Sequence, residues 1–326
     1  MDYGFDFTND ICYISVFNGK EIEDLDCVSC PSTLDERILF AEEYRKEETD
    51  RAVLVIEEMT KEALACHQPG ILLASKEQAF AAYLFEQSNP IWKRETAAFE
   101  FHKNYFSYLQ FKLQGKACLV EKKQEMIVEL QSEKSKDKFF TKQAADRLNH
   151  GSIANVFLVG EEFEGEWMKM SLASLCSGRR VFMGNHLFAN GAVFLLKESE
   201  QKYTVYTRDH HLYYWGIRAF HHGQKDVFVP IIQPGEFWFT TEGSVRILLD
   251  ECDVLEIEGI HSITRQKLNI KLPLHMKQQY PTRTTKLKIQ MYCTGSKTLK
   301  MIVHDMGFGM TREGKGIIYQ EEFKLP

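Results

Sequence analysis

The sequence predicts two fold classes in one chain, an α/β region followed by an all-β region. Up to about residue 197, short apolar runs typical of buried strands alternate with stretches of helical composition, as in α/β proteins. After about Lys202 the pattern changes to short alternating runs separated by Gly, Pro, Asp and Ser, which is typical of antiparallel sheets. A third observation, an internal repeat, divides the α/β region into two halves.

The repeat begins with two similar hairpins. Residues 4–20 are GFDFTNDICYISVFNGK, and residues 98–116 are AFEFHKNYFSYLQFKLQGK. Both run from an apolar residue through Phe, an acid and Phe to a polar turn, and then to an alternating aromatic strand that ends near a Gly. Such self-similarity predicts a duplicated structural unit.

Each half continues with further strands and helices. In the first half, Ser32 and Thr33 are candidate N-caps, with Asp35 and Glu36 placed to complete a capping box. The first half is predicted to contain a third strand within 21–30, a helix from Ser32 to about Glu48, a strand at 51–58, a helix at 59–68, a strand at 71–75 and a helix at 76–87. The second half is predicted to contain two further strands that end near Leu130, a loop at 131–138, helices at 139–150, 163–178 and 185–198, and strands at 154–160 and 179–184.

The final helices of the two halves carry small residues at matching places. Ala79, Ala81 and Ala82 lie in one helix, and Ala189, Gly191 and Ala192 lie in the other. Small side chains on one helix face allow two helices to approach closely. The matching positions favour a direct contact between these helices over ordinary core alanines.

The all-β region is predicted to form a sandwich of about eight to ten antiparallel strands. The candidate strands lie at 203–209, 211–220, 225–232, 235–242, 244–250, 253–260, 267–274, 284–295, 297–305 and 316–323.

Composition limits the classes of function. The net charge of −6 argues against general nucleic-acid binding, which requires a basic excess. Neither a signal peptide nor an apolar run of about 18 residues is apparent, so we expect no membrane span. The eight cysteines are scattered, and Cys27 and Cys30 form a lone CxxC without a second pair. Reduced thiols in a cytoplasmic protein are therefore expected, in preference to a metal or redox site.

The order of elements resembles that of the DnaK-type heat-shock chaperones in the actin/sugar-kinase ATPase superfamily. GFDFTN stands where this family has its first phosphate loop, and AAFEFHKN stands where it has the second. Residues 154–196 resemble the closing segment with the adenosine loop, and 225–239 with 281–309 resemble the peptide-binding β-domain. The resemblance implies two tandem ribonuclease-H-like, or actin-like, lobes at 1–95 and 96–198. An antiparallel β-sandwich would follow at 199–326. It also implies a bacterial branch of this superfamily.

The resemblance further implies a nucleotide site, but the residues argue against its chemistry. The site would comprise Asp6, Thr8, Asn9, Glu100 and Gly160, with Asp6 holding metal-bound water and Thr8 and Asn9 bonding phosphate. Phosphate turns need glycines, because backbone N–H groups must approach the phosphate closely. Thr8 replaces the expected glycine of the first turn, and His102 and Lys103 replace those of the second. We therefore expect Asp6 to hydrogen-bond its own hairpin instead of holding magnesium.

Other candidate motifs favour structural explanations. GMTREGKG at 309–316 lacks the Ser or Thr of a phosphate loop and precedes a strand, so a glycine-rich hairpin is expected. The pairs His210-His211 and His221-His222 flank one aromatic segment, with no carboxylate or Cys placed to complete a metal site. The sequence thus predicts no catalytic residue and no metal ligand.

We interpret the chain as a pseudo-ATPase module joined to a β-sandwich, acting as a non-enzymatic scaffold that binds a protein or peptide. An apolar groove around Ile231, Ile232, Phe237 and Phe239 is the predicted partner site. No cofactor is expected on this interpretation. The alternative is a divergent chaperone-like switch that binds ATP with Mg²⁺ and hydrolyses it weakly or not at all. A third possibility is a subunit that polymerises, and the sequence leaves the oligomeric state open.

Overall fold

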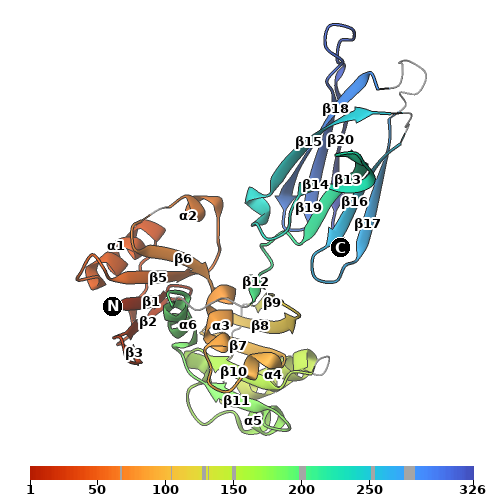
Figure 1. Cartoon of the computed structure of the whole chain (residues 1–326). Helices are drawn as coiled ribbons and strands as arrows, with labels where there is room; N and C mark the ends of the chain where they lie inside the picture. Colours follow the sequence, from red (N-terminus) through yellow and green to blue (C-terminus); the bar gives the residue numbers. More distant parts are fainter. Residues whose placement is uncertain are drawn as a thin grey trace. The chain divides into compact units, whose positions relative to one another are not determined.

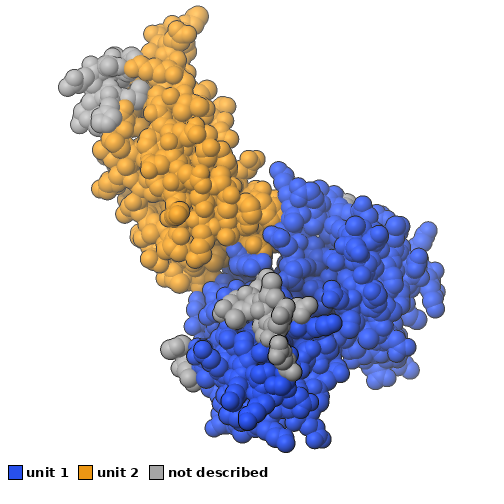
Figure 2. Space-filling view, turned by 180° about the vertical axis from the view of Figure 1, so that it is seen from behind, with its two compact units in different colours: residues 1–208 blue, residues 209–326 orange. Residues whose placement is uncertain are grey.

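The chain forms two compact units, residues 1–208 and residues 209–326, each with its own hydrophobic core (Figures 1 and 2). The computed structural model describes the 326 residues except 67, 104, 127–129, 131, 149–151, 198–202, 251–253 and 275–282. Unit 1 is mixed α/β, and the described part of unit 2 is all-β apart from one short 3-10 helix. The α/β and all-β parts expected from the sequence are therefore present in the expected order.

The first sheet of unit 1 has the strand order β3-β2-β1-β5-β6, and β4 pairs with β2. The hairpin strands β1, β2 and β3 are antiparallel, whereas β1, β5 and β6 are parallel. The strands are β1 (Asp2–Asp6), β2 (Ile11–Phe17), β3 (Ile22–Asp24), β4 (Val28–Ser29), β5 (Arg51–Ile56) and β6 (Ile71–Ser75). The helices are α1 (Leu34–Tyr44), α2 (Lys61–Ala65) and α3 (Lys76–Phe85). Thr33 is the N-cap of α1 and forms a capping box with Glu36.

The second sheet repeats this topology. Its order is β11-β10-β7-β8-β9-β12, so β7, β8, β9, β10 and β11 correspond in order and direction to β1, β2, β3, β5 and β6. The strands are β7 (Thr96–His102), β8 (Tyr105–Gln114), β9 (Ala117–Met126), β10 (Asn155–Val159), β11 (Arg180–Met183) and β12 (Thr204–Tyr206). The helices are α4 (Glu133–Leu148), α5 (Lys169–Leu175) and α6 (Leu187–Leu195), with 3-10 turns η1 (Ile91–Lys93) and η2 (Glu161–Phe163).

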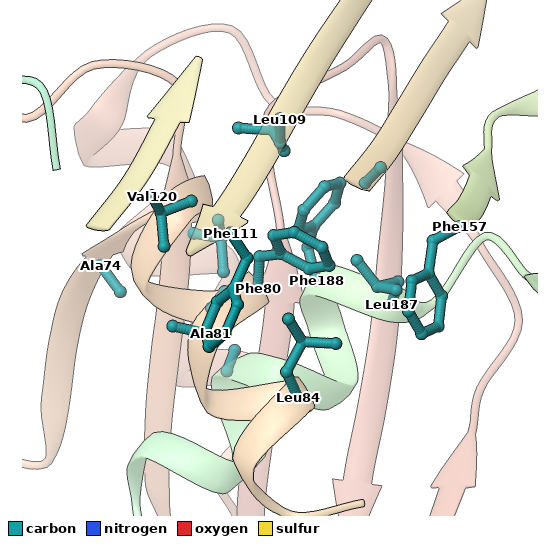
Figure 3. Packing of buried hydrophobic residues seen from close by; sticks show 14 of the residues in the cluster. Ala74, Phe80, Ala81, Leu84, Leu109, Phe111, Val120, Phe157, Leu187 and Phe188 are labelled. Atoms are coloured by element: carbon teal, nitrogen blue, oxygen red, sulfur yellow. The ribbon is translucent and has the colours of Figure 1, made fainter. Parts of the chain in front are cut away.

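Helices α3 and α6, one from each half, pack against each other between the two sheets (Figures 1 and 3). The ring of Phe80 on α3 lies 6.5 Å from that of Phe188 on α6, 6.5 Å from Phe111 on β8 and 6.0 Å from Phe157 on β10. Because aromatic and aliphatic side chains of both halves share this core, the halves form one unit. The outer faces of the sheets have separate cores, with α1 on the first sheet and α4 and α5 on the second.

Unit 2 consists of two four-stranded antiparallel sheets with the orders β14-β13-β16-β17 and β15-β18-β19-β20. Alternate residues of both sheets enter one core, for example Trp215 and Ile257 from the first and Ile289 and Met301 from the second. The strands are β13 (Tyr213–His221), β14 (Gln224–Ile232), β15 (Glu242–Leu249), β16 (Val254–His261), β17 (Lys267–Pro273), β18 (Thr285–Gly295), β19 (Thr298–Asp305) and β20 (Gly316–Lys324).

Two of the ten predicted strands of the all-β region are corrected by the structure. Residues 203–209 contribute β12, which pairs in parallel with β9 and so extends the second sheet of unit 1. The centre of 235–242 forms the 3-10 helix η3 (Trp238–Thr240), although alternating aromatics predicted a strand there. The boundary between the two compact units falls at 208/209, after β12. None of the helices in the described part of the chain is long and apolar enough to cross a membrane.

Candidate functional site

The first polar turn is closed by its own side chains. Asp6 ends β1 and is 1% exposed, and its Oδ1 accepts hydrogen bonds from the backbone N–H of Thr8 (3.1 Å) and from the Thr8 hydroxyl (2.6 Å). The side-chain amide of Asn9 donates to the Thr8 hydroxyl (3.2 Å). The three residues predicted to bind metal water and phosphate are thus brought together, and they bond one another as expected for a carboxylate that stabilises its hairpin.

The second turn is occupied by a carboxylate of the chain itself. Nδ1 of His102 lies 2.5 Å from one oxygen of Glu161, and the backbone N–H of Lys103 donates to the other (2.9 Å). Partial burial favours the neutral form of Glu161, but the contacts with His102 and Lys103 lower its pKa to about 2. Glu161 is therefore an anion that uses the donors a phosphate would need at this turn.

Gly160 serves close backbone packing at the same turn. Its φ is +116°, and a Cβ atom there would lie 2.2 Å from the carbonyl oxygen of Phe101 in β7. Its N–H donates to the side chain of Asn185 (2.8 Å). The glycine that was predicted to belong to an adenosine loop instead lets the segment after β10 approach β7, and this approach positions Glu161.

Glu100 lies inside β7, fully buried, and not in the turn. The hydroxyl of Ser107, opposite it on β8, donates to its Oε2. Its other oxygen, Oε1, lies 2.7 Å from the ammonium nitrogen of Lys76. Glu100 matches Asp6 in the repeat, but Asp6 is bonded within its own hairpin, whereas Glu100 also pairs with Lys76 of the other half.

Lys76 is the residue of the site that sequence reasoning missed. It begins α3 directly after β6, its N-cap is Ser75, and its side chain is 1% exposed. The ammonium nitrogen also lies 3.0 Å from Oε2 of Glu57, the residue that follows β5. The carboxyl ends of neighbouring parallel strands lie at one edge of a sheet, so Asp6, Glu57 and Lys76 meet there. The sequence signal for this cluster was therefore an acid or a base at the carboxyl end of each predicted parallel strand.

Further groups complete the surroundings of the Lys76 ammonium. The rings of Tyr105 and Phe188 each have their centroids 5.5 Å from it. Lys122 on β9 forms a second ion pair with Glu57. The N–O distances of Lys76 to Glu57 and Glu100 are those of ion pairs.

The charges in this cluster stabilise one another. Burial opposes the charge of Lys76, but Glu100 and Glu57 more than offset it, so the pKa of Lys76 is raised well above its ordinary value. Burial likewise opposes the charge of Glu57, but Lys76 and Lys122 lower its pKa overall. For Asp6 burial prevails: its pKa is raised, although the charge of Lys76 and the bonds from Thr8 act in the other direction.

The residues present do not fit nucleotide with magnesium. Mg²⁺ demands octahedral oxygen ligands and would carry two positive charges into the space that the Lys76 ammonium shares with Glu57 and Glu100. Phosphate would meet the Glu161 carboxylate at the second turn. Asp6, Thr8, Asn9, Glu100 and Gly160 are each used in internal contacts, as described above.

The four residues of the predicted partner groove in unit 2 fall into two groups. Ile231 and Ile232 are 9% and 2% exposed and belong to the core, so their predicted contact with a partner is corrected: the second sheet covers them. Phe237 and Phe239 are half-buried, with their rings stacked at 5.3 Å and 10°. The ring of His210 lies 4.6 Å from that of Phe237.

The remaining sequence motifs have structural explanations. Among the described residues no group of three or more His, Cys, Asp or Glu side chains could hold a metal ion. Cys27 is exposed and Cys30 half-buried, and both are free thiols, whereas Cys252 lies outside the described residues. GMTREGKG lies mostly in the connection between β19 and β20, where Gly309 and Gly316 have positive φ. It is a hairpin connection, as expected.

Comparison with known families covers both units. A model for the C-terminal part of a family of unknown function, DUF5716, matches residues 45–208, half of the chain. The chain belongs to the DUF5716 family. The matched part of this DUF5716 protein includes Glu57, Lys76, Glu100 and Lys122, whereas Asp6 precedes it. A second model, for the domain of unknown function DUF8552, matches residues 210–325, and the boundary between the two matches coincides with the boundary between the compact units.

Several solved structures are similar to part of this DUF5716 protein. A ROK hexokinase from Thermus thermophilus matches with a TM-score of 0.38 and 12% identity, over 59% of this chain and 96% of the hexokinase. A glucokinase from an Antarctic psychrotroph matches with a TM-score of 0.38 and 10% identity, over 61% and 99%. A Bacteroides thetaiotaomicron protein with an actin-like ATPase fold and unknown function matches with a TM-score of 0.35 and 9% identity, over 59% and 95%. No protein with a curated description matches the chain.

Proposed function

We propose that this DUF5716 protein is a non-enzymatic scaffold that binds a protein or peptide partner, built on a degenerate actin-like fold. The repeated strand order supports two lobes, at about 1–95 and 96–198, and the two facing antiparallel sheets support a chaperone-like β-sandwich after them. The free thiols fit a cytoplasmic location. One observation carries the proposal: the Glu161 carboxylate occupies the donors of the second turn.

The alternative, an ATP-dependent switch, keeps one argument in its favour. The two hairpins retain an acid at corresponding places, Asp6 and Glu100, in two sheets of the same topology. The two functions differ in their response to nucleotide, because a ligand that binds the native state raises its stability. We expect the unfolding temperature of the full chain to be the same with and without millimolar Mg-ATP. A reproducible rise that saturates with ATP would favour the switch.

The partner site is proposed at the stacked pair Phe237 and Phe239. Half-buried aromatic rings that stack on each other present rigid apolar surface, which is typical of residues that dominate interfaces. Ile231 and Ile232 are buried in the core of unit 2, so the proposed contact surface is limited to Phe237 and Phe239. The occupant would be an extended peptide with an apolar or aromatic anchor.

Selection from a peptide library against the full chain, followed by fluorescence anisotropy, tests this role. We expect the double substitution Phe237→Ala and Phe239→Ala to lower the affinity for the selected peptide by about tenfold or more, as for aromatic hot spots. Phe220→Ala is the matched control, because Phe220 is 69% exposed and outside the core of unit 2. Equal loss in both variants, or failure to select any peptide, would contradict the proposal.

A further inference from the structure

The cluster around Lys76 contains one buried ammonium between two acidic side chains. Its nitrogen lies 2.7 Å from Glu100 and 3.0 Å from Glu57. The side chains of Lys76 and Glu100 are 1% and 0% exposed. Isolated charges are not buried in this way, because the loss of hydration must be offset by close opposite charges.

The two acids come from different halves of the unit. Glu57 follows β5 in the first sheet, whereas Glu100 lies in β7 of the second. Lys76 begins α3, whose side chains share a core with both halves. A single cation at this place therefore bridges carboxylates that would otherwise repel one another across the two halves.

We propose that the Lys76 ammonium is a built-in cation that takes the place of a divalent metal ion between Glu57 and Glu100. The positive charge belongs to a side chain of α3, so the acids need no cation from solution. This inference goes beyond the proposed scaffold role and is independent of the partner that unit 2 binds.

The chemistry of the acids predicts what removal of the lysine would produce. Carboxylate oxygens are the ligands that Mg²⁺, Mn²⁺ and Ca²⁺ prefer, and two or three carboxylates with water are sufficient for a site. Lys76→Ala would delete the positive charge and free the volume of the side chain while leaving Glu57 and Glu100 in place. The variant is then expected to acquire a divalent-cation site that the natural chain does not have.

Binding of Mn²⁺ to the full chain, followed by electron paramagnetic resonance and by thermal unfolding, tests the inference. We expect Lys76→Ala to bind one Mn²⁺ per chain at least about tenfold more tightly than the natural chain, because a like charge has been removed from the site. The unfolding temperature of this variant should rise with Mn²⁺ concentration. Lys122→Ala is the matched control: it also removes an ion pair of Glu57, but it leaves Lys76 in place and should gain no Mn²⁺ site.

The test remains decisive if Lys76→Ala does not fold without metal. In that case Mn²⁺ in the refolding buffer should restore folding, and the double variant Lys76→Met with Glu100→Gln should fold without metal. The inference is overturned if the natural chain binds Mn²⁺ as tightly as Lys76→Ala, if a folded Lys76→Ala gains no affinity, or if neither rescue occurs. None of these outcomes depends on peptide binding, so failure of the scaffold role would be seen separately.

Discussion

A Cβ atom at Gly191 would lie 2.0 Å from the carbonyl oxygen of Ala79, so helices α6 and α3 touch backbone to backbone. The same closeness occurs where α6 crosses β1, since a Cβ atom at Gly4 would lie 2.1 Å from the carbonyl oxygen of Ala189. Small residues at matching places in the two final helices predicted a direct contact, and this is the contact. It joins the two halves of unit 1 at their common core.

Gly191→Ala should therefore destabilise unit 1, by about 3 kcal/mol. Alanine is the better helix former by about 1 kcal/mol, so a net loss can only come from the clash with Ala79. Chemical denaturation followed by circular dichroism measures the change. Gly184→Ala is the matched control because no atom lies within 4 Å of its added Cβ. If Gly191→Ala is as stable as the natural chain or more stable, helices α3 and α6 can move apart without loss of unfolding free energy.

Thr8→Val should weaken the first hairpin, because it removes the hydroxyl that donates to the buried carboxylate of Asp6 at 2.6 Å. The expected loss of unfolding free energy is about 1 to 2 kcal/mol, typical of a buried acceptor that loses one donor. Asn9→Ala leaves both bonds to Asp6 intact and should cost less. If Asn9→Ala costs as much as Thr8→Val, the hairpin is not organised around Asp6.

The ion pair of Asp305 and Arg312 should contribute strongly to unit 2. Asp305 is 2% exposed, accepts two hydrogen bonds from the Arg312 guanidinium, one of them at 2.6 Å, and accepts a third from the N–H of Gly307 at 3.0 Å. Asp305→Asn leaves the guanidinium poorly paired and should cost about 3 kcal/mol of unfolding free energy.

The matched control for that substitution is Asp226→Asn, which removes an exposed carboxylate 3.5 Å from Arg218. Exposed pairs contribute about 0 to 1 kcal/mol. Calorimetry of the full chain should therefore show a marked fall in unfolding temperature for Asp305→Asn and little change for Asp226→Asn. The pKa of Asp305 is lowered overall, because Arg312 and two backbone N–H groups outweigh its burial. Its contribution should persist at neutral pH and be lost as the pH falls below about 4.

Unit 2 should lose stability between about pH 6.5 and pH 4. Burial lowers the pKa of His210 and of His211 to about 4, whereas a histidine in the unfolded chain has a pKa of about 6.5. As the pH falls through this interval the unfolded chain takes up protons that the folded chain does not, so unfolding is favoured. The loss is on the order of 3 kcal/mol per histidine at most.

Calorimetry as a function of pH measures this loss, and His211→Gln should reduce it. Nδ1 of His211 lies 3.4 Å from the thiol sulfur of Cys293. The substitution removes this contact, and the resulting loss of unfolding free energy does not vary with pH. His221→Gln, at an exposed position, should leave the pH dependence unchanged. If the stability of His211→Gln falls between pH 6.5 and pH 4 as much as that of the natural chain, other groups cause the pH dependence.

The two units should unfold independently. Among the described residues, the core of unit 2 is formed by side chains from residues 213–325, and the cores of unit 1 are formed by side chains from before residue 209. We expect a fragment of residues 209–326 to unfold cooperatively with the same midpoint as the corresponding transition of the full chain. A fragment that is unfolded at room temperature would show that the boundary at 208/209 does not separate independent folding units.

Periodic features of the chain could be predicted because they depend on neighbouring residues. The duplicated hairpins, the capping box at Thr33 and the alternation along β18 each depend on spacings of two to four residues. The same local signal was wrong for residues 235–242, where Trp238 and Phe239 lie in the 3-10 helix η3. Aromatic alternation reports which side chains are apolar, not whether a neighbouring strand is available to pair.

What only the tertiary structure decided is which of these residues meet. The sequence by itself determined two similar α/β halves, an all-β region and two hairpins without the glycines of phosphate turns. It did not reveal that Lys76 would lie between Glu57 and Glu100, because these residues are 19 and 24 positions away from it and the strand order alone brings them together. Nor did it reveal that Ile231 and Ile232 face the core. The buried face of a strand is set by the sheet that packs on it, and that sheet is distant in sequence.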